Sequence, residues 1–304
     1  MYKLTQEKNQ TELYASGHRA CAGCGQSIAA RTVARILGKE TIICNATGCL
    51  EVTTTPIPES SWRMPWVHSL FENVASVATG VLSALKAQGK ADKIKVVAQG
   101  GDGGTFDIGF GLISGMWERR DNILYVCYDN EGYMNTGYQN SGASPYTAST
   151  STAPAGKFSF GNHQQKKNLP RIAMAHNIAY TAVASVSDLY DLERKVKKAL
   201  TYTGPKYLQI YCPCIPGWKT EPKDTIKIAQ LAVESGVYPI FEAEGEKVIA
   251  YKKPLATPPK VEEFLKLQKR FAHLFKTEEG KAEIAEIQKM ADENLAKAKS
   301  FVAI

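Results

Sequence analysis

The stretch KIKVVAQGGDGGTFDIG, residues 93–109, carries the strongest information on the fold. Its apolar part, Ile94 to Ala98, is rich in β-branched residues and predicts a buried strand. The strand leads into four glycines around Asp102, and Phe106 to Arg119 then follows a helical pattern. A second apolar run, Ile123 to Tyr128, predicts the next strand, so this region has the form of a strand–helix–strand unit.

The same alternation continues on both sides of this unit. It predicts further strands at 41–44, 180–184 and 207–211, and helices at 74–86, 172–177 and 187–201. Strands separated by helices are typical of a mostly parallel sheet, and continuous apolar strands indicate helices on both faces. We therefore expect an α/β fold.

The chain changes character at Pro254, within the string KPLATPPK. We expect residues 1–253 to form the α/β domain and residues 254–304 to form a helical tail that contacts a partner subunit. Amphipathic patterns predict helices in this tail at 261–275 and 277–301. Two long irregular stretches, 50–67 and 137–170, adjoin the motifs described below, and we expect them to be functional loops.

The composition excludes several classes of protein. The 304 residues are 44% hydrophobic and 22% charged, which is typical of globular proteins and not of disordered ones. No apolar run approaches the roughly 18 residues of a membrane helix, and no secretory signal is visible, so we expect a cytoplasmic protein with no membrane partner. The formal charge of +7 arises in residues 151–227, where 12 Lys and Arg face 5 Asp and Glu. Because no basic block has interleaved aromatics, nucleic acid is not an expected partner.

A candidate site for an anion and a cation follows the predicted strand Ile94 to Ala98. Asp102, between Gly101 and Gly103, lies where α/β proteins bind ligands, at the carboxyl end of a strand and before a helix. Glycines let the backbone approach a diphosphate, and a helix N-terminus favours its charge. Asn130 follows the next strand 28 positions later, so its side chain can lie near Asp102. Together with a backbone carbonyl near Gly132, these oxygens suit Mg²⁺.

The seven cysteines are the second unusual feature. They are Cys21, Cys24, Cys44, Cys49, Cys127, Cys212 and Cys214. The first two form a CxxC motif, which by itself fits a redox dithiol, half of a zinc site or part of an iron–sulfur site. With a third cysteine at 49 and two late candidates at 212 and 214, four thiolates can hold zinc or a [4Fe–4S] cluster, and the spacing does not decide between them. The cysteines at 44 and 127 lie in apolar strands, where we expect them to be buried.

A family resemblance rests on six strings that occur in this order: GHRACAGCG, NATGCLEV, WRMPWVHSLFEN, GDGGTFDIG, YDNEGYMNTGYQNSGASP and PCIPGW. Together they resemble the β subunit of the 2-oxoacid:ferredoxin oxidoreductases, pyruvate:ferredoxin oxidoreductase especially. Oxalate and 2-oxoisovalerate oxidoreductases are close relatives within this group. The resemblance covers about residues 17 to 245 and implies the thiamine diphosphate-binding fold.

The resemblance also implies the ligands of one proximal [4Fe–4S] cluster. They are Cys21, Cys24, Cys49 and Cys214. The family string Pro-Cys-Pro-x-Gly-Trp is interrupted here by Ile215, and Cys212 lies two positions before Cys214, so the fourth ligand stays open between the two.

For the organic cofactor, the resemblance implies thiamine diphosphate bound through Mg²⁺. The residues implied to bind it are Gly101, Asp102, Gly103, Asn130, Gly132 and Cys49. Among them Asp102 and Asn130 are side-chain ligands of Mg²⁺, and Gly132 is a ligand through its carbonyl. Asn135 matches an active-site asparagine close to the reacting centre, and we expect it to be catalytic.

The implied reaction is the oxidative decarboxylation of a 2-oxoacid, with pyruvate as the expected substrate and electrons passed through the cluster to ferredoxin. Coenzyme A is the expected co-substrate if the substrate is pyruvate-like. Oxalate, which leaves no acyl group, and branched-chain 2-oxoacids stay open. A subunit of another class, either a non-catalytic electron carrier or a zinc-stabilised binding subunit, is disfavoured because Asp102, Asn130 and Asn135 are all present.

The resemblance implies partner chains as well. In this superfamily the glutamate that activates the cofactor lies on a pyrimidine-binding domain, and 304 residues leave room for one such α/β domain. We therefore expect a pyrimidine-domain (alpha) subunit. No second set of cysteines is available for further clusters, so we also expect a ferredoxin-like subunit or domain, and external ferredoxin as the final acceptor.

Overall fold

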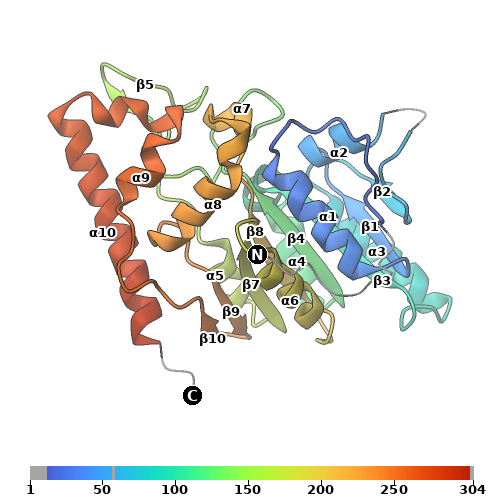
Figure 1. Ribbon diagram of the computed structural model, residues 1–304. Coiled ribbons are helices and arrows are strands. Elements are labelled where there is room, and N and C mark those ends of the chain that lie inside the picture. The colour runs from blue at the N-terminus through green and yellow to red at the C-terminus, as the bar shows by residue number, and fades with distance from the viewer. Residues whose placement is uncertain (1–11, 57–58, 302–304) are drawn as a thin grey trace.

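The computed structural model describes residues 12–56 and 59–301 (Figure 1). Residues 1–11 of the predicted domain, 57–58 of the first irregular stretch and 302–304 of the predicted tail therefore lie outside the described residues. The described part contains a sheet of eight strands with helices on both faces. The predicted α/β fold with a mostly parallel sheet is confirmed.

The eight strands run in the order β10-β9-β7-β8-β4-β3-β1-β2. Their bounds are β1 Thr41–Asn45, β2 Trp66–His68, β3 Lys95–Gly101, β4 Ile123–Asp129, β7 Tyr180–Ser185, β8 Lys206–Tyr211, β9 Phe241–Glu244 and β10 Lys247–Tyr251. The strands from β7 to β2 are parallel, while β9 and β10 extend the sheet antiparallel. A separate hairpin of β5 Ala155–Gly156 and β6 Ser159–Phe160 lies in the second irregular stretch.

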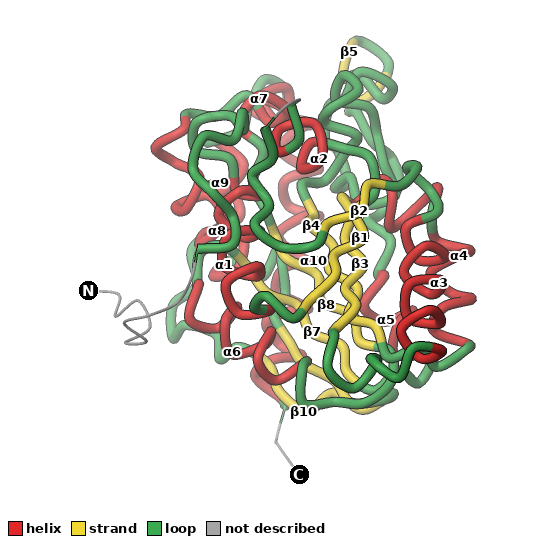
Figure 2. The backbone as a smooth tube through the Cα atoms, turned by 90° about the vertical axis from the view of Figure 1, so that its right-hand side faces the viewer, coloured by secondary structure: helices red, strands yellow, loops and turns green. Residues whose placement is uncertain are grey.

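Figure 2 shows the sheet between two layers of helices. One layer holds α1 Gly25–Leu37, α6 Leu189–Ala199 and α8 Thr225–Glu234, and the other holds α3 Val74–Ala87, α4 Phe110–Glu118 and α5 Leu169–Ala175. Alternate residues of each central strand face the two layers, and all seven residues of β4 are buried. This double coverage explains why the central strands are apolar throughout. Cys44 and Cys127 are buried against the second layer, as expected.

The remaining helical elements are short, apart from the last one. They are α2 Cys49–Thr54, η1 Gly103–Ile108, α7 Ile215–Trp218, η2 Pro222–Asp224, α9 Val261–Lys266, η3 Lys269–Phe275 and α10 Glu278–Ser300. The helix predicted from Phe106 to Arg119 is divided, because η1 is a wide π-helical turn in which the Gly109 N–H donates to the Gly104 carbonyl at 3.0 Å. Within the described residues, every helix is too short or too polar to span a membrane.

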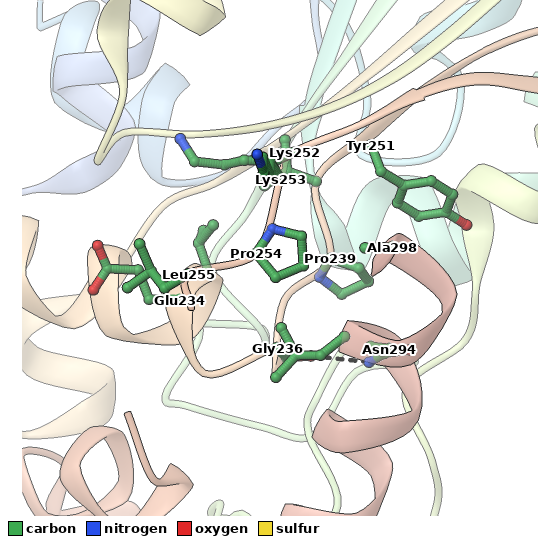
Figure 3. A pocket seen from close by; sticks show the side chains of 13 residues that line it. Glu234, Gly236, Pro239, Tyr251, Lys252, Lys253, Pro254, Leu255, Asn294 and Ala298 are labelled. Carbon is green, nitrogen blue, oxygen red and sulfur yellow. Dashed lines mark hydrogen bonds between the residues drawn. The ribbon is translucent and has the colours of Figure 1, made fainter. Parts of the chain in front are cut away.

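The C-terminal helices pack against the α/β unit. Phe264 and Phe271 belong to the same apolar cluster as the first helical layer and the sheet. Helix α10 lies against Gly236, where φ is +86° and a Cβ would come within 2.5 Å of the Ala291 carbonyl oxygen. Asn294 donates to the Gly236 carbonyl at 3.0 Å beside a cavity of about 70 Å³ (Figure 3). The domain division at residue 253 and the role of the tail as a subunit contact stay predictions.

A buried carboxylate joins the antiparallel edge of the sheet to helix α6. Glu242 on β9 accepts a hydrogen bond from the Tyr180 hydroxyl at 2.7 Å and forms an ion pair with Arg194. Burial raises the pKa of Glu242, but the hydrogen bonds from Arg194 and Tyr180 outweigh burial and bring the pKa to about 2.

We expect Glu242→Gln to lower the free energy of unfolding at pH 7 by about 2 kcal/mol, because it removes hydrogen bonds to a charged group. The pKa of Glu242 is about 2 in the fold, below its ordinary value of 4.5, so this stabilisation is present above pH 4.5 and is lost as the pH falls toward 2. Urea titrations from pH 7 to pH 3 measure the difference, which should shrink in acid. Glu246→Gln alters an exposed carboxylate and serves as the control; equal losses in the two variants would contradict the assignment.

Candidate functional site

Apart from Cys21 and Cys24, which precede α1, the predicted site residues lie at or after the carboxyl ends of four neighbouring strands, β8, β4, β3 and β1. The chain leaves β1 toward Cys49, β3 into Asp102, β4 into Asn130, and β8 toward Cys214. Because parallel neighbours end at the same edge of a sheet, these four connections meet there, where open α/β sheets bind ligands. The fold thus brings together residues that are up to 165 positions apart in the sequence (49 to 214).

Asp102 lies in a corner formed by oxygen atoms. It is 1% exposed, and its Oδ2 accepts a hydrogen bond from the Ser141 hydroxyl at 2.6 Å. One terminal atom of the Asn130 amide lies 2.9 Å from Asp102 Oδ1 and 3.0 Å from the Gly132 carbonyl oxygen. A nitrogen at this place donates to both oxygens. An oxygen at this place makes a group of three oxygens about 3 Å apart, which is the separation of adjacent ligands around octahedral Mg²⁺ with bonds of about 2.1 Å.

The surroundings of Asp102 suit a cation in this corner. Burial, and after it the nearby Asp129, raises the pKa of Asp102 to about 8, so the neutral carboxyl is favoured when no cation is bound. Lys166 lies against Asp129, with its Nζ 2.6 Å from Asp129 Oδ2. In residues 12–56 and 59–301, no Lys or Arg forms an ion pair with Asp102 itself. The ionised form of a buried carboxyl requires a compensating positive charge, which a divalent cation in this corner would supply.

A cavity of about 70 Å³ opens beside this corner. Its lining contains all six residues predicted to bind the organic cofactor, namely Cys49, Gly101, Asp102, Gly103, Asn130 and Gly132. Thr47, Phe71 and Tyr133 also line it, and the sequence analysis did not single out Phe71 or Tyr133. Both stand within the quoted strings, but only the fold shows that their side chains face the same space.

The two glycines around Asp102 differ in their surroundings. A Cβ on Gly103 would lie 2.4 Å from a ring carbon of Tyr133, whereas a Cβ on Gly101 would meet nothing closer than 4.0 Å. The Tyr133 ring is held over Gly103 because its hydroxyl donates to Asp107 Oδ2 at 3.0 Å. Gly103 is thus required by the packing of the site, while Gly101 leaves free space for a ligand.

A second cavity, of about 230 Å³, is lined by cysteines. They are Cys21, Cys24, Cys49, Cys212 and Cys214, and all are free thiols. The CxxC motif reaches the cavity because Gly25 packs on the loop after β8: its N–H donates to the Pro213 carbonyl at 3.2 Å, and a Cβ there would lie 2.9 Å from Pro213 N. The structure therefore brings all four predicted cluster ligands to one cavity.

The thiols in this cavity influence one another. Burial raises the pKa of Cys49 to about 12 and that of Cys214 to about 12, and in both cases Cys21 and Cys24 add to the shift. Burial also raises the pKa of Cys24, and hydrogen bonds from Ser27 and from the backbone of Gln26, at the start of α1, reduce this rise. The three groups with a raised pKa are therefore neutral thiols when no metal is bound, and their thiolate forms would need a bound positive centre for stabilisation.

The two late cysteines have different environments. Cys212 is fully buried, and its thiol donates to the Ile210 carbonyl at 3.2 Å. Cys214 is partly exposed, and the pKa of its thiol responds to Cys49, Cys24 and Cys21. Among the described residues, no three His, Cys, Asp or Glu side chains converge as they do around a single metal ion.

The two cavities share a wall. The residues that line both are Gln26, Cys49, Asn130, Met134 and Asn135. Asn135, the predicted catalytic residue, is exposed where the cavities meet. Gln26 is 5% exposed and was missed by the sequence analysis, although its place directly after CxxCG could have indicated it. Cys49 therefore lies between the corner of oxygens and the other cysteines.

Comparison with known families assigns the class of this domain. The family described as thiamine pyrophosphate enzyme, C-terminal TPP binding domain, matches residues 46–210. The match begins directly after β1 and ends within β8, so it contains the corner of Asp102, Asn130 and Gly132. Fold and site together define a thiamine diphosphate-binding enzyme domain.

Relatives with known names identify the family within this class of enzymes. Pyruvate synthase subunit PorB of Methanosarcina barkeri is 51% identical over 92% of this chain and 94% of its own length. The PorB of Methanocaldococcus jannaschii is 52% identical, with 93% and 95% covered. Ketoisovalerate oxidoreductase subunit VorB of Pyrococcus abyssi is 40% identical, with 87% of each chain covered. The chain belongs to the 2-oxoacid:ferredoxin oxidoreductase family, as a beta subunit, and the predicted resemblance is confirmed.

A solved structure shows the same fold. The 2-oxoglutarate:ferredoxin oxidoreductase from Magnetococcus marinus superposes with a TM-score of 0.59, covering 75% of this chain and 82% of that chain at 19% identity. At this identity the likeness concerns the fold alone.

We expect Gly103→Ala to lower the free energy of unfolding of the cofactor-free protein by about 2 kcal/mol, because its methyl group would overlap the Tyr133 ring. Gly101→Ala, two residues away, is the matched control and should change stability by less than about 0.5 kcal/mol. Urea unfolding without cofactor measures both. Adding Tyr133→Ala to Gly103→Ala should recover part of the loss relative to Tyr133→Ala alone; no recovery would show that the ring is not the obstacle.

Proposed function

We propose that this chain binds thiamine diphosphate with Mg²⁺ and one [4Fe–4S] cluster, and that it serves the oxidative decarboxylation of a 2-oxoacid. The observation that carries this proposal is the shared wall between a cavity with a corner of oxygens and a cavity with four predicted cluster ligands. A cofactor that releases electrons in one cavity would lie directly beside an acceptor in the other.

In this proposal Asp102, Asn130 and Gly132 are the protein ligands of Mg²⁺, and Gly101 and Gly103 give the diphosphate access to the backbone. The arrangement in support of it is that one terminal atom of the Asn130 amide lies about 3 Å from both the Gly132 carbonyl oxygen and Asp102, a buried carboxyl group that lacks an ion pair in the described part of the chain. When bound, thiamine diphosphate supplies the carbanion for attack on the 2-oxo group and stores the electrons left after loss of carbon dioxide. The chain's own contribution is to fix the position of the diphosphate end.

The proposed cluster ligands are Cys21, Cys24, Cys49 and Cys214. Their common cavity and their mutual effect on thiol pKa support this set. Cys214 is preferred to Cys212 because the thiol of Cys212 is already engaged by the Ile210 carbonyl. A cubane also suits the cavity better than zinc does, since each thiolate binds a different iron and the sulfurs need not converge on one point.

Asn135 is the proposed catalytic residue. It is exposed at the junction of the two cavities and lies on the turn that follows the Mg²⁺ ligands. Its amide can both donate and accept a hydrogen bond, so it can orient the carboxylate and the 2-oxo oxygen of a bound substrate.

Pyruvate is the proposed substrate, with coenzyme A as the acceptor of the acyl group. Relatives named pyruvate synthase subunit PorB are 42–52% identical to this chain, and the ketoisovalerate oxidoreductase subunit VorB is 40% identical. Oxalate and branched-chain 2-oxoacids remain the alternatives that a substrate panel distinguishes.

We further propose that the chain works only within a complex in the cytoplasm. The relatives carry names of subunits, and the described residues supply one half of a thiamine diphosphate site. A pyrimidine-domain (alpha) subunit would complete the site, a ferredoxin-like subunit or domain would carry electrons onward, and external ferredoxin would receive them. The helical tail, residues 254–304, is a candidate for one of these contacts.

We expect the protein purified without oxygen to contain about four iron and four sulfide per chain and to absorb near 400 nm. Cys49→Ala should lose the cluster, because it removes one of the four ligands. Cys127→Ala, which alters a thiol buried in β4, is the matched control and should keep it. Iron, sulfide and zinc assays decide the matter, and stoichiometric zinc in place of iron would exclude the cluster.

The whole proposal is tested on the complex reconstituted with its pyrimidine-domain and ferredoxin-like partners. We expect pyruvate- and coenzyme A-dependent reduction of viologen by the complex and none by the isolated chain, because neither half of the cofactor site positions the cofactor alone. Asp102→Ala should lose bound thiamine diphosphate and keep its iron. Asn135→Ala should keep both and lose turnover by about 100-fold, as expected when a transition-state hydrogen bond is removed.

Wild-type turnover in the Asp102→Ala and Asn135→Ala complexes would refute the residue assignments. Turnover by the isolated chain would instead refute the shared site while leaving the assignments intact.

A further inference from the structure

Glu131 has an unusual backbone conformation at a sensitive place. Its φ is +64°, in the left-handed region that residues other than glycine rarely occupy. It stands between Asn130 and Gly132, the two residues proposed to complete the Mg²⁺ corner with Asp102. The conformation of Glu131 therefore determines whether the Asn130 amide and the Gly132 carbonyl point to the same place. Such strained residues persist only where the surroundings hold them.

Two cations from distant parts of the chain hold the Glu131 side chain. Arg270 Nη2 lies 2.5 Å from Glu131 Oε2, and Lys166 Nζ lies 3.1 Å from Glu131 Oε1. The side chains of Arg270 and Glu131 are each 3% exposed, whereas that of Lys166 is 23% exposed. Both carboxylate oxygens are thus engaged, and the more buried of the two ion pairs is the one with Arg270.

Arg270 also reaches the neighbouring residue through a tryptophan. Its guanidinium lies 3.9 Å from the centre of a Trp218 ring, and the Trp218 indole N–H donates to the Asn130 carbonyl at 2.9 Å. Cation and ring attract each other in this geometry. The Arg270 guanidinium therefore contacts both Glu131 itself and Trp218, the residue that holds the Asn130 carbonyl.

Arg270 is itself fixed by its own segment. It belongs to η3, after the region matched by the thiamine pyrophosphate family, and its Nε donates to Gln268 Oε1 at 2.9 Å. The Arg270 carbonyl accepts a hydrogen bond from the Ser149 N–H at 3.0 Å. These contacts fix the position of the Arg270 guanidinium next to the turn 130–132.

We propose that Arg270 is a positioning residue that holds the turn 130–132 in the conformation that binds Mg²⁺, a role that rests on the proposed function of that turn. The C-terminal segment, which we expect to contact a partner subunit, would then also support the cofactor site, through the contact of Arg270 with Glu131. Replacing a residue that holds a metal ligand in place commonly weakens metal binding by about 10- to 100-fold.

The test uses the reconstituted complex with thiamine diphosphate and Mn²⁺ in place of Mg²⁺, because bound Mn²⁺ is counted directly by electron paramagnetic resonance. Arg270→Met keeps an apolar chain over Trp218 and removes the charge. We expect it to bind Mn²⁺ at least about tenfold more weakly, to raise the KM for Mg²⁺ with kcat at saturating Mg²⁺ unchanged, and to keep its iron content. Arg63→Met, which alters an exposed arginine, is the control and should match wild type.

Two further variants make the result decisive. In a Glu131→Gln background, Arg270→Met should weaken Mn²⁺ binding much less than in wild type, because its main partner is already changed. Arg270→Lys keeps a charge without the planar fork, so it should bind Mn²⁺ between wild type and Arg270→Met; if Arg270→Met fails to assemble, wild-type affinity in Arg270→Lys overturns the inference.

Reduced thermal stability of Arg270→Met with unchanged Mn²⁺ affinity would assign Arg270 a structural role only and overturn the inference. Asp102→Ala separates this failure from failure of the proposed function. If Asp102→Ala loses Mn²⁺ and Arg270→Met does not, the inference alone is wrong. If Asp102→Ala binds Mn²⁺ as wild type does, the proposed cation site is wrong, and the inference falls with it.

Discussion

Three carboxylates are buried together at the carboxyl ends of β3 and β4, and much of the site is arranged to compensate their charge. Asp102, Asp129 and Glu131 are each at most 3% exposed. Burial raises the pKa of Glu131, yet Lys166 and Arg270 bring it below the ordinary value, while Asp102 keeps a pKa well above it. The raised pKa of Asp102 means that burial favours its neutral form when no cation is bound, so a bound metal ion would be what stabilises its charged form.

This requirement explains two features that are otherwise hard to understand. The irregular stretch 137–170 is far longer than a connection needs to be, and it supplies Lys166 to the acids and the Ser141 hydroxyl to Asp102. The C-terminal segment returns across the molecule and supplies Arg270. Ser141 and Lys166 lie outside helices and strands, whereas Arg270 lies on the short helix η3, and each of them places a single polar group against the end of a strand.

The parts that sequence reasoning predicted depend on local patterns. Apolar β-branched runs indicated β3 and β4, and the glycines around Asp102 together with the spacing to Asn130 indicated the corner between them. The parts it missed depend on tertiary contacts. The sequence around Lys166 and Arg270 does not distinguish these residues from lysines and arginines on the surface. Strand Phe241–Glu244 was not predicted because it is short and contains two glutamates. The division of the helix after Gly103 was also missed, because a π-helical turn leaves no clear periodic pattern in six residues.

The cation corner and the cysteine cavity are mechanically connected as well as adjacent. A Cβ on Gly217 would meet Met134 Sδ at 2.2 Å and Cys214 Sγ at 3.2 Å, so the loop after β8 packs directly on the turn that follows Gly132. Trp218 is the last residue of α7, which also contains Gly217, and its indole N–H donates to the Asn130 carbonyl. A displacement of the loop that carries Cys214 therefore displaces Asn130, and the reverse also holds. Since electron transfer between two cofactors requires a fixed separation, this packing would provide the rigidity that the proposed transfer needs, and Cys49 is one of the residues that line both cavities.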